Sequence, residues 1–374
     1  MYKNTLPKIS FLCLLIHTYL GQDMLFNSTY KIVINSLGGV IMKKIIGILA
    51  ILLVTSNIWA QGPGTTNANF LKTNQGIIPI AMGETYVAIA EGIDTIYWNP
   101  AGLKQLQNTT ASFMHSFWLE DIKIEHIACG LPIGELGTIG IGFTLVNCGS
   151  IDKTIENNHG QYLGEEGKVS AVSWSGIATY SQKLGKLLLL KSDFLDQILL
   201  GASFKLISEN IADAKLTGHG FDIGLLWKLQ SESSSDTYQG WQVGIVGQNL
   251  GHTTEKTLPI NLKAGIGYIW PSLIFSRDVL NLGLDVLFPI DNKIKTSLGC
   301  EYGYKGKRLE VYGRAGYKIG NEIKDHDILS GFSCGAGLGI IGGGIKYNLN
   351  YAYVPYGELD ITHRIALQIS FLSR

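Results

Sequence analysis

Residues 280–288 read Leu-Asn-Leu-Gly-Leu-Asp-Val-Leu-Phe, and this pattern decides the fold class. Every even position in the segment is apolar, and Asn281, Gly283 and Asp285 lie between those positions. A period of two places alternate side chains on opposite faces of a β-strand. The segment therefore predicts a strand with one apolar face and one polar or small face.

The same alternation recurs through most of the chain. Apolar residues occupy the even positions of 258–270, the odd positions of 345–353 and, except for His363, the odd positions of 361–371. After about residue 108 we count fourteen such segments, roughly 110–118, 122–131, 136–147, 168–183, 196–208, 217–230, 239–249, 258–271, 279–288, 294–304, 308–319, 328–340, 343–353 and 361–372. Most are about ten residues long, whereas strands of soluble proteins average five or six.

Three features favour a membrane barrel over a soluble sandwich. The strands are long, their second face is rich in small and polar residues, and aromatic residues gather at strand ends. An even strand number also fits a single-chain barrel whose termini share one side of the membrane. The prediction is an all-β transmembrane antiparallel β-barrel of about 14 strands. Strand parity then turns Leu284, Cys300 and Cys334 toward lipid and Gly283 toward the lumen.

Composition agrees with a membrane protein. The chain has 374 residues, of which 46% are hydrophobic and 16% charged, against roughly 25% charged residues in soluble domains. Glycine is abundant, with 46 residues. The formal net charge is zero, which argues against nucleic acid as a partner.

The N-terminal part indicates export. Residues 45–54 form an apolar run of ten residues, and a membrane-spanning helix needs about 20. Met42, Lys43 and Lys44 precede this run and Ala60 follows it, so 42–60 has the parts of a signal peptide. Residues 1–41 are then an upstream extension that is not native, although the apolar run 11–16 is a competing signal core. The predicted location is the cell outer membrane, with outer-membrane lipid around the barrel.

Between the signal and the first strand lies a segment that does not alternate. It contains the stretch 82–103, which begins Met-Gly-Glu-Thr and ends Asn-Pro-Ala-Gly-Leu. This stretch resembles the start of the PorV/PorQ family, part of the wider FadL-like outer-membrane proteins. Glu84 and Thr85 depart from the Gly-Ala of the family pattern. The ending, with Tyr-Ala-Tyr at 351–353 and Thr-His-Arg-Ile at 362–365, resembles the family too.

The resemblance implies that residues 61–108 form an N-terminal plug inside a barrel of residues 109–374. It also implies a latch in which Asn99, Pro100, Ala101 and Gly102 form a turn that locks the plug to the wall where the first strand begins. Proline presets φ near −65°, glycine accepts a positive φ, and asparagine closes turns.

Two functions remain open for such a barrel. Resemblance to PorV/PorQ implies protein export or surface attachment of the type IX secretion kind, with secreted cargo or secretion-system proteins as partners. The alternative is a FadL-like passive channel for hydrophobic small molecules such as long-chain fatty acids, with an apolar pocket between plug and wall. Candidates for that pocket are Ile77, Ile78, Ile80, Met82, Val87 and Ile89.

An outer-membrane enzyme is the least favoured class, and we expect no catalytic, cofactor or metal site. The sequence has no Gly-x-Ser-x-Gly, His-Glu-x-x-His, Walker or Cys-x-x-Cys motif. The glycine-spaced piece 335–339 lies inside an alternating strand, which favours small lumen-facing residues over a nucleotide loop. The four cysteines after residue 60 give no predicted pairing.

Nine charged residues share the polar parity of their strands, and we expect them to face the lumen. Ion pairs in a solvated lumen are the preferred interpretation, and a pathway for a charged substrate is the alternative. These residues are Lys263, Asp285, Lys295, Glu301, Glu310, Arg314, Lys318, Lys346 and Arg364. The longest connection, 148–167, is predicted to be an external loop.

Overall fold

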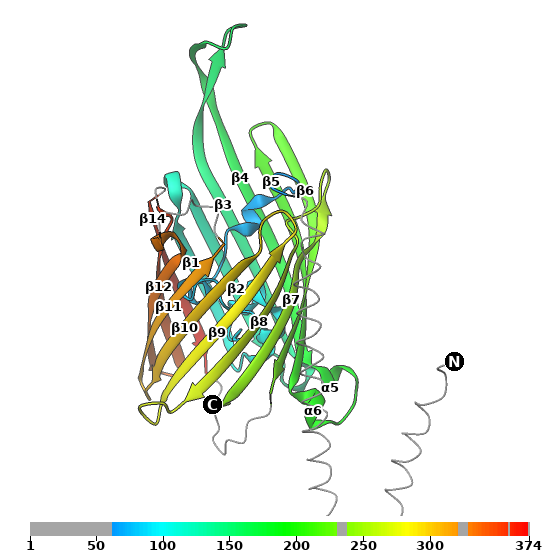
Figure 1. Cartoon of the computed structure of the whole chain (residues 1–374), viewed down its shortest axis with the longest axis vertical. Helices are drawn as coiled ribbons and strands as arrows, with labels where there is room; N and C mark the ends of the chain where they lie inside the picture. The colour runs from blue at the N-terminus through cyan, green and yellow to red at the C-terminus, as the bar shows by residue number, and fades with distance from the viewer. Residues whose placement is uncertain (1–61, 230–237, 321–327, 358–359, 373–374) are drawn as a thin grey trace, which may run out of the picture. The chain divides into compact units, whose positions relative to one another are not determined.

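The computed structural model describes residues 62–229, 238–320, 328–357 and 360–372. The predicted upstream extension 1–41 and signal peptide 42–60 lie outside the described residues. Within the described part, fourteen antiparallel strands close into a barrel in which each strand pairs with its sequence neighbours and β1 pairs with β14 (Figure 1). The predicted fold class is confirmed.

The strands follow the alternating segments closely. They are β1 (Thr109–Phe117), β2 (Lys123–Pro132), β3 (Thr138–Glu156), β4 (Tyr162–Lys183), β5 (Ile198–Ile211), β6 (Ala214–Lys228), β7 (Gly240–Thr253), β8 (Asn261–Pro271), β9 (Asp278–Pro289), β10 (Lys295–Lys305), β11 (Leu309–Ile319), β12 (Phe332–Gly342), β13 (Ile345–Pro355) and β14 (Ile361–Phe371).

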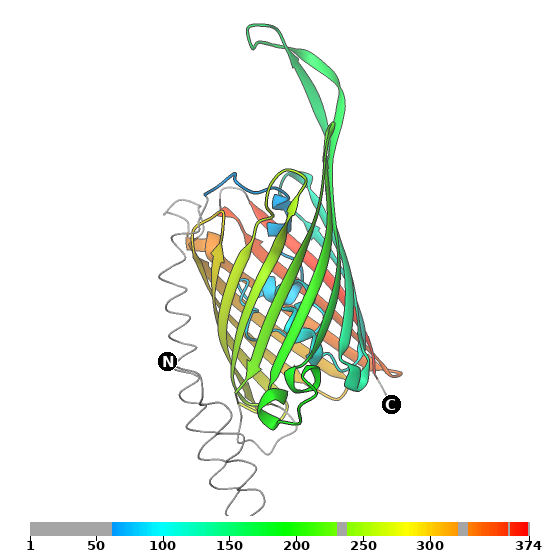
Figure 2. The same cartoon turned by 90° about the vertical axis from the view of Figure 1, so that its right-hand side faces the viewer.

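The predicted loop 148–167 is wrong, because β3 and β4 continue through most of it as a paired hairpin. Their register runs on past bulges from Ser150 opposite Ser170 to Glu156 opposite Tyr162. Figure 2 shows this hairpin projecting from one end of the barrel. Alternation fails here because both faces of the hairpin are exposed, so neither face selects apolar residues.

We call this end of the barrel the hairpin end. The opposite end, where β1 begins and β14 ends, is called the termini end.

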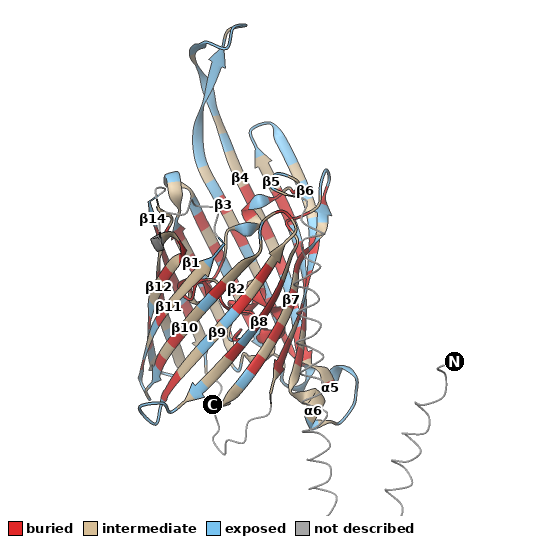
Figure 3. Ribbon diagram, in the orientation of Figure 1, coloured by how far each residue is buried: buried red, intermediate tan, exposed pale blue. Residues whose placement is uncertain are grey.

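Burial alternates along the strands as the parity predicts (Figure 3). On β9, Leu284 is 39% exposed on the outer surface, whereas Asp285 is fully buried. Exposed Leu, Ile and Phe side chains lie on the outside of strands all round the barrel. This continuous apolar outer surface is much larger than the apolar patches of soluble monomers, and it fits contact with lipid.

Short helices connect or precede the strands. They are η2 (Asn69–Lys72), α3 (Ile77–Ala81), α4 (Thr95–Trp98), η3 (Pro100–Gln105), η4 (Leu119–Asp121), η5 (Gly134–Leu136), α5 (Leu184–Leu187), α6 (Asp193–Asp196) and η6 (Ile328–Gly331). No helix in the described ranges is long and apolar enough to cross a membrane.

From about residue 68 to residue 108 the chain lies inside the barrel, and this segment supplies half of the buried hydrophobic residues. One cluster joins Ile77, Met82, Tyr86 and Trp98 to small residues of the wall, Ala352 on β13 and Ala366 on β14. We call residues 62–108 the plug. Its helices are at most six residues long, so its shape depends on packing against the wall more than on helical hydrogen bonds.

The wall meets the plug at glycines, which explains why this chain needs so many of them. A Cβ atom at any of eleven strand glycines would lie only 2.0–2.7 Å from a plug atom. They are Gly130, Gly140, Gly142, Gly201, Gly224, Gly244, Gly267, Gly283, Gly299, Gly316 and Gly335. We call this set the glycine belt. The belt also corrects the expectation for Gly283, which faces inward but contacts Thr85 of the plug rather than open lumen.

Candidate functional site: the plug and its cavities

A carboxylate on the wall holds the centre of the plug. Asp285 Oδ2 accepts hydrogen bonds from the backbone N–H groups of Tyr86 (2.6 Å) and Val87 (2.8 Å). The Ser333 hydroxyl on β12 accepts a third, from the N–H of Gly83 at 2.9 Å. The N–H of Gly83 also donates to the carbonyl oxygen of Ile80 at 3.2 Å. Asp285 is therefore the acceptor that satisfies the buried N–H groups of Tyr86 and Val87.

Asn99 joins the plug to a second part of the wall, strand β6. Its side-chain amide donates to the carbonyl oxygen of Val87 at 2.8 Å and to that of Leu225 on β6 at 3.2 Å. Its Oδ1 accepts from the N–H of Ala101 at 3.2 Å, which caps η3. Asn99 is fully buried, so its amide is paired with three backbone groups.

The structure differs from the expected latch in two ways. Asn99 and Pro100 contact β6 and β5 through Gly224 and Gly201, not the start of β1. Gly102 does not have a positive φ. A side chain is excluded there because a Cβ would lie 2.6 Å from the carbonyl oxygen of Ala90. The motif therefore begins a short 3-10 helix that packs closely against the wall.

Four of the nine predicted lumen charges form two ion pairs near the termini end. The Arg314 guanidinium lies 2.5 Å from Glu301, and the Lys346 ammonium lies 2.5 Å from Glu310. Each pair links different strands, β11 with β10 and β13 with β11. The four side chains are at most 21% exposed, so both pairs lie inside the barrel.

Three more of these residues contact the plug toward the hairpin end. Lys318 forms an ion pair with Glu84, the position at which the chain departs from the PorV/PorQ pattern. Arg364 donates to the carbonyl oxygen of Asn74 at 3.0 Å. The Lys263 ammonium lies 4.5 Å from the ring centroid of Trp98, in cation–π distance. Lys295 lines a small cavity described below, and Asp285 holds Tyr86 and Val87.

Sequence reasoning missed a buried pair on β5 and β6. Lys205 lies 2.8 Å from Asp222 and donates to Asn249 Oδ1 at 2.7 Å. All three are buried. Lys205 and Asp222 lie at inward-facing positions of their strands, so the alternation of the sequence could have identified them.

Asp94 of the plug is a carboxyl group whose burial disfavours the charged form. It is 3% exposed, and burial raises its pKa to about 6 in spite of hydrogen bonds from the Ile78 backbone and the Gln368 side chain. Gly76 packs directly on it, since a Cβ there would lie 2.7 Å from Asp94 Cγ. Asp94 is therefore a titratable group within the plug fold.

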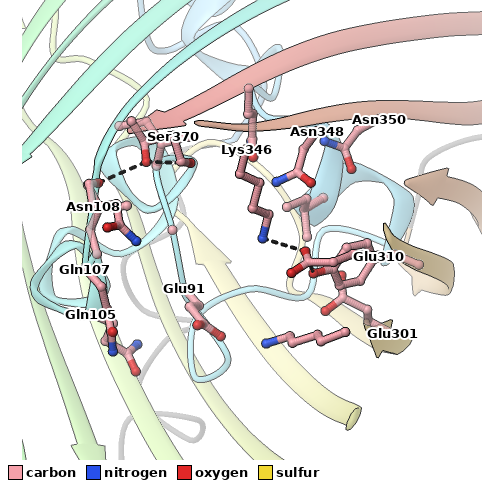
Figure 4. Close-up of a pocket in the computed structure, with 18 of the residues that line it drawn as sticks. Glu91, Gln105, Gln107, Asn108, Glu301, Glu310, Lys346, Asn348, Asn350 and Ser370 are labelled. Atoms are coloured by element: carbon pink, nitrogen blue, oxygen red, sulfur yellow. Dashed lines mark hydrogen bonds and ion pairs between the residues drawn. The ribbon is translucent and has the colours of Figure 1, made fainter. Parts of the chain in front are cut away.

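A cavity of about 330 Å³ lies beside the plug core near the termini end. Its lining includes the apolar plug residues Ile78, Met82 and Ile89 and mostly polar residues of the wall strands. Figure 4 shows polar groups from both parts, such as Glu91 of the plug and Glu310 and Lys346 of the wall. We call this space the plug cavity. The other three predicted pocket residues, Ile77, Ile80 and Val87, are buried in packing instead. The prediction of a purely apolar pocket was therefore incomplete.

The plug separates this cavity from the hairpin end. A space of about 1010 Å³ lies beside it at the termini end and shares Glu91, Gln105 and Lys305 with it. On the hairpin side, the cavity lined by Lys263, Lys295 and Glu84 measures only about 100 Å³. Among the described residues, the interior therefore has more free space toward the termini end than toward the hairpin end.

The fold and this interior define a class: a plugged β-barrel with a small amphipathic cavity between plug and wall. No family model matches the sequence, and no curated protein matches it. Among solved structures, the toluene transporter TodX of Pseudomonas putida is similar, with 11% identity over 79% of this chain and 97% of that chain and a TM-score of 0.53. The toluene transporter TbuX of Ralstonia pickettii shows 12% identity, the same coverage of both chains and a TM-score of 0.51.

At such identities the likeness concerns the fold. It shows that this chain and the two transporters share a barrel fold, and the FadL-like superfamily stays a prediction. PorV/PorQ membership itself stays a prediction.

Proposed function

We propose that the protein is a passive outer-membrane channel for small hydrophobic molecules. The observation that carries this proposal is the plug cavity, whose apolar side consists of Ile78, Met82 and Ile89. Its volume of about 330 Å³ lies at the lower end of the range for small-molecule sites. The shared fold with two toluene transporters supports the same proposal.

A passive mechanism follows from the arrangement of the interior. The cavity adjoins the larger space at the termini end, and the plug lies between it and the hairpin end. Transfer therefore requires the plug to shift locally, without leaving the barrel, while the belt glycines and Asp285 keep its centre in place. No covalent chemistry is needed, because an apolar solute moves down its own concentration gradient.

Filling the cavity tests this function. Ile78→Trp puts a larger side chain into the cavity, and Leu338→Trp puts the same side chain on the outer surface, where Leu338 is 42% exposed. We expect intact cells with the Ile78 variant to take up labelled naphthalene several-fold more slowly than cells with wild-type protein at equal barrel content. The Leu338 variant should match wild type. Equal uptake by all three would contradict a route through the cavity.

A second function is favoured by the β3–β4 hairpin. Its exposed side chains include Ile151, Ile155, Tyr162 and Leu163, and an isolated two-stranded hairpin is marginally stable in water. A secreted protein or a secretion component that covers it would give the PorV/PorQ-like role in export or attachment. Deleting residues 149–166 should then abolish secretion of cargo and leave naphthalene uptake unchanged.

A further inference from the structure

The polar side of the plug cavity contains side-chain groups that the protein itself leaves without partners. Asn350 on β13 is 2% exposed, and its Oδ1 accepts a hydrogen bond from Arg314 at 3.0 Å. The charged donor fixes the orientation of the amide, because a guanidinium can only donate. The Asn350 Nδ2 donor therefore points away from Arg314, and it has no partner among the described residues.

A complementary acceptor lies across the same ion pair. Asn281 on β9 donates from Nδ2 to Glu301 Oε1 at 3.0 Å, which fixes this amide too, since a carboxylate only accepts. Asn281 Oδ1 is then an acceptor that has no partner in the described part of the chain. Asn348 Oδ1, one inward position along β13 from Asn350, is a second such acceptor. Figure 4 shows Asn348 and Asn350 side by side at the cavity.

Two glycines on β12 leave space for the side chains of Asn348 and Asn350. Gly337 lies opposite Asn350 and Gly339 lies opposite Asn348 in the sheet register. A Cβ at Gly337 would lie 2.6 Å from Asn350 Oδ1 and 2.9 Å from Arg314 Nη1. Side chains of β11 and β13 therefore meet above a strand that has none of its own at these positions.

The charges around these groups are already neutralised. Arg314 pairs with Glu301 and Lys346 pairs with Glu310, and the remaining charged residues at the cavity, Glu91 and Lys305, are one of each sign. A charged ligand would have to break a buried pair, which is strongly unfavourable. An uncharged hydroxyl group meets no such obstacle, and it both donates and accepts one hydrogen bond.

We propose that the plug cavity is a binding site for an uncharged amphiphile: an apolar body with a hydroxyl group. These three atoms are covered in the structure, so the hydroxyl reaches them when neighbouring side chains move aside. It then accepts from Asn350 Nδ2 and donates to Asn281 Oδ1 or Asn348 Oδ1, while the body lies against Ile78, Met82 and Ile89. This assignment rests on the proposed channel function and makes alcohols and phenols its preferred substrates, with the parent hydrocarbons bound more weakly. A site with buried polar groups built to pair a hydroxyl discriminates strongly against an analogue that lacks it.

Three probes with one ring system test this assignment: naphthalene, 1-naphthol and 1-naphthoate. Binding to the purified full-length barrel in micelles is measured by equilibrium dialysis against empty micelles, which subtracts partition into detergent. We expect 1-naphthol to bind at least about tenfold more tightly than either other probe, as one good hydrogen bond in a buried site allows. Equal binding of naphthalene and naphthol, tightest binding of naphthoate, or no binding of naphthol would each overturn the proposal.

Matched asparagine variants locate the site. Asn350→Leu and Asn281→Leu should each reduce the preference for naphthol over naphthalene to about twofold or less. Asn261→Leu is the control, because Asn261 lies on the hairpin side of the plug and also has an acceptor without a partner in the described residues. Its preference should equal that of wild type. A preference that survives in both cavity variants would overturn the proposed site.

The result remains distinguishable from failure of the channel function. Naphthalene uptake by intact cells measures the channel, whereas the naphthol preference measures the site. Uptake without a naphthol preference would reject the site alone, and absence of both would reject the two proposals together.

Discussion

Asp285 Oδ2 lies 2.6 Å from the backbone nitrogen of Tyr86, at the point where a strand of the barrel wall meets the plug. The same oxygen accepts from Val87, so one carboxylate satisfies two consecutive backbone donors. Both partners are buried. This relationship makes the seating of the plug depend on a side chain 199 positions later in the chain.

Removing that acceptor should loosen the plug. Asp285→Ala leaves two buried N–H groups unpaired, each at a cost of about 1–3 kcal/mol. We expect an intact barrel whose plug is cut faster by added protease. Asp285→Asn, which keeps one acceptor oxygen, should give intermediate protection. Wild-type protection of the alanine variant would show that Asp285 does not hold the plug.

Asn99 offers an isosteric test of the latch. Asn99→Asp keeps the acceptor for Ala101 but removes both hydrogen bonds donated to Val87 and Leu225, and it places a charge beside two carbonyl oxygens. The plug should become more accessible to protease and cells should admit more of a small dye. Band mobility in unheated detergent gels should stay that of the folded barrel. Unchanged permeability and protection would show that the motif does not act as a latch.

The glycine belt predicts a large contrast within one strand. Gly316→Leu would force a side chain into the plug backbone, since its Cβ would lie 2.0 Å from the carbonyl carbon of Met82. Overpacking of this kind typically costs about 1–3 kcal/mol or more. Gly313→Leu on the same strand meets no atom within 4 Å and serves as the control. Only the Gly316 variant should lose protease protection of the plug, and equal behaviour of the two would refute the belt.

The outer surface can be tested at Leu284. Arginine on the lipid side of a barrel costs about 2–4 kcal/mol at the middle of the bilayer, so Leu284→Arg should lower the fraction of heat-modifiable protein in the outer membrane. Leu284→Phe should assemble normally. If both variants assemble equally well, the outer surface does not contact lipid at this position.

Asp94 predicts a pH dependence of plug stability. Its pKa in the folded protein is raised to about 6 by burial, so the folded state binds a proton more tightly than the unfolded chain, whose carboxyl titrates near 3.9. This contribution to stability is fully present below about pH 4 and is lost as pH rises through about 6. Asp94→Asn should reduce the slope of stability against pH in thermal unfolding followed from pH 4 to 7.5. An identical slope in the variant would assign the dependence to another group.

Local pattern was sufficient to predict the barrel but not the contacts inside it. Parity depends only on neighbouring residues, so it indicated strand positions and the inward direction of residues such as Arg314 and Glu301. The partner of each residue depends on the sheet register and on whether its side chain can extend over a neighbouring strand. Arg314 on β11, for example, donates to Asn350 on β13 because Gly337 on β12 between them has no side chain. Neither quantity can be read from one strand alone.

The plug and the hairpin show two other limits of sequence reasoning. The plug sequence has no regular period because the plug packs on all sides. Its apolar residues were therefore predicted as one group of pocket candidates, and of those six only Ile78, Met82 and Ile89 line the cavity. The hairpin also lacks a period, for the opposite reason that it is exposed on both faces. Absence of alternation thus has two physical causes that one sequence does not separate.

The most direct test of the channel function is the selectivity of uptake in intact cells, because an uncharged hydrocarbon crosses a phospholipid bilayer unaided and the intact outer membrane is the barrier that matters. Initial rates for labelled naphthalene and for a sugar of similar size are compared in cells with and without the protein. We expect several-fold faster entry of naphthalene in cells with the protein and no change for the sugar. Equal acceleration of both solutes would indicate a general pore, and no acceleration of naphthalene would contradict a hydrophobic channel.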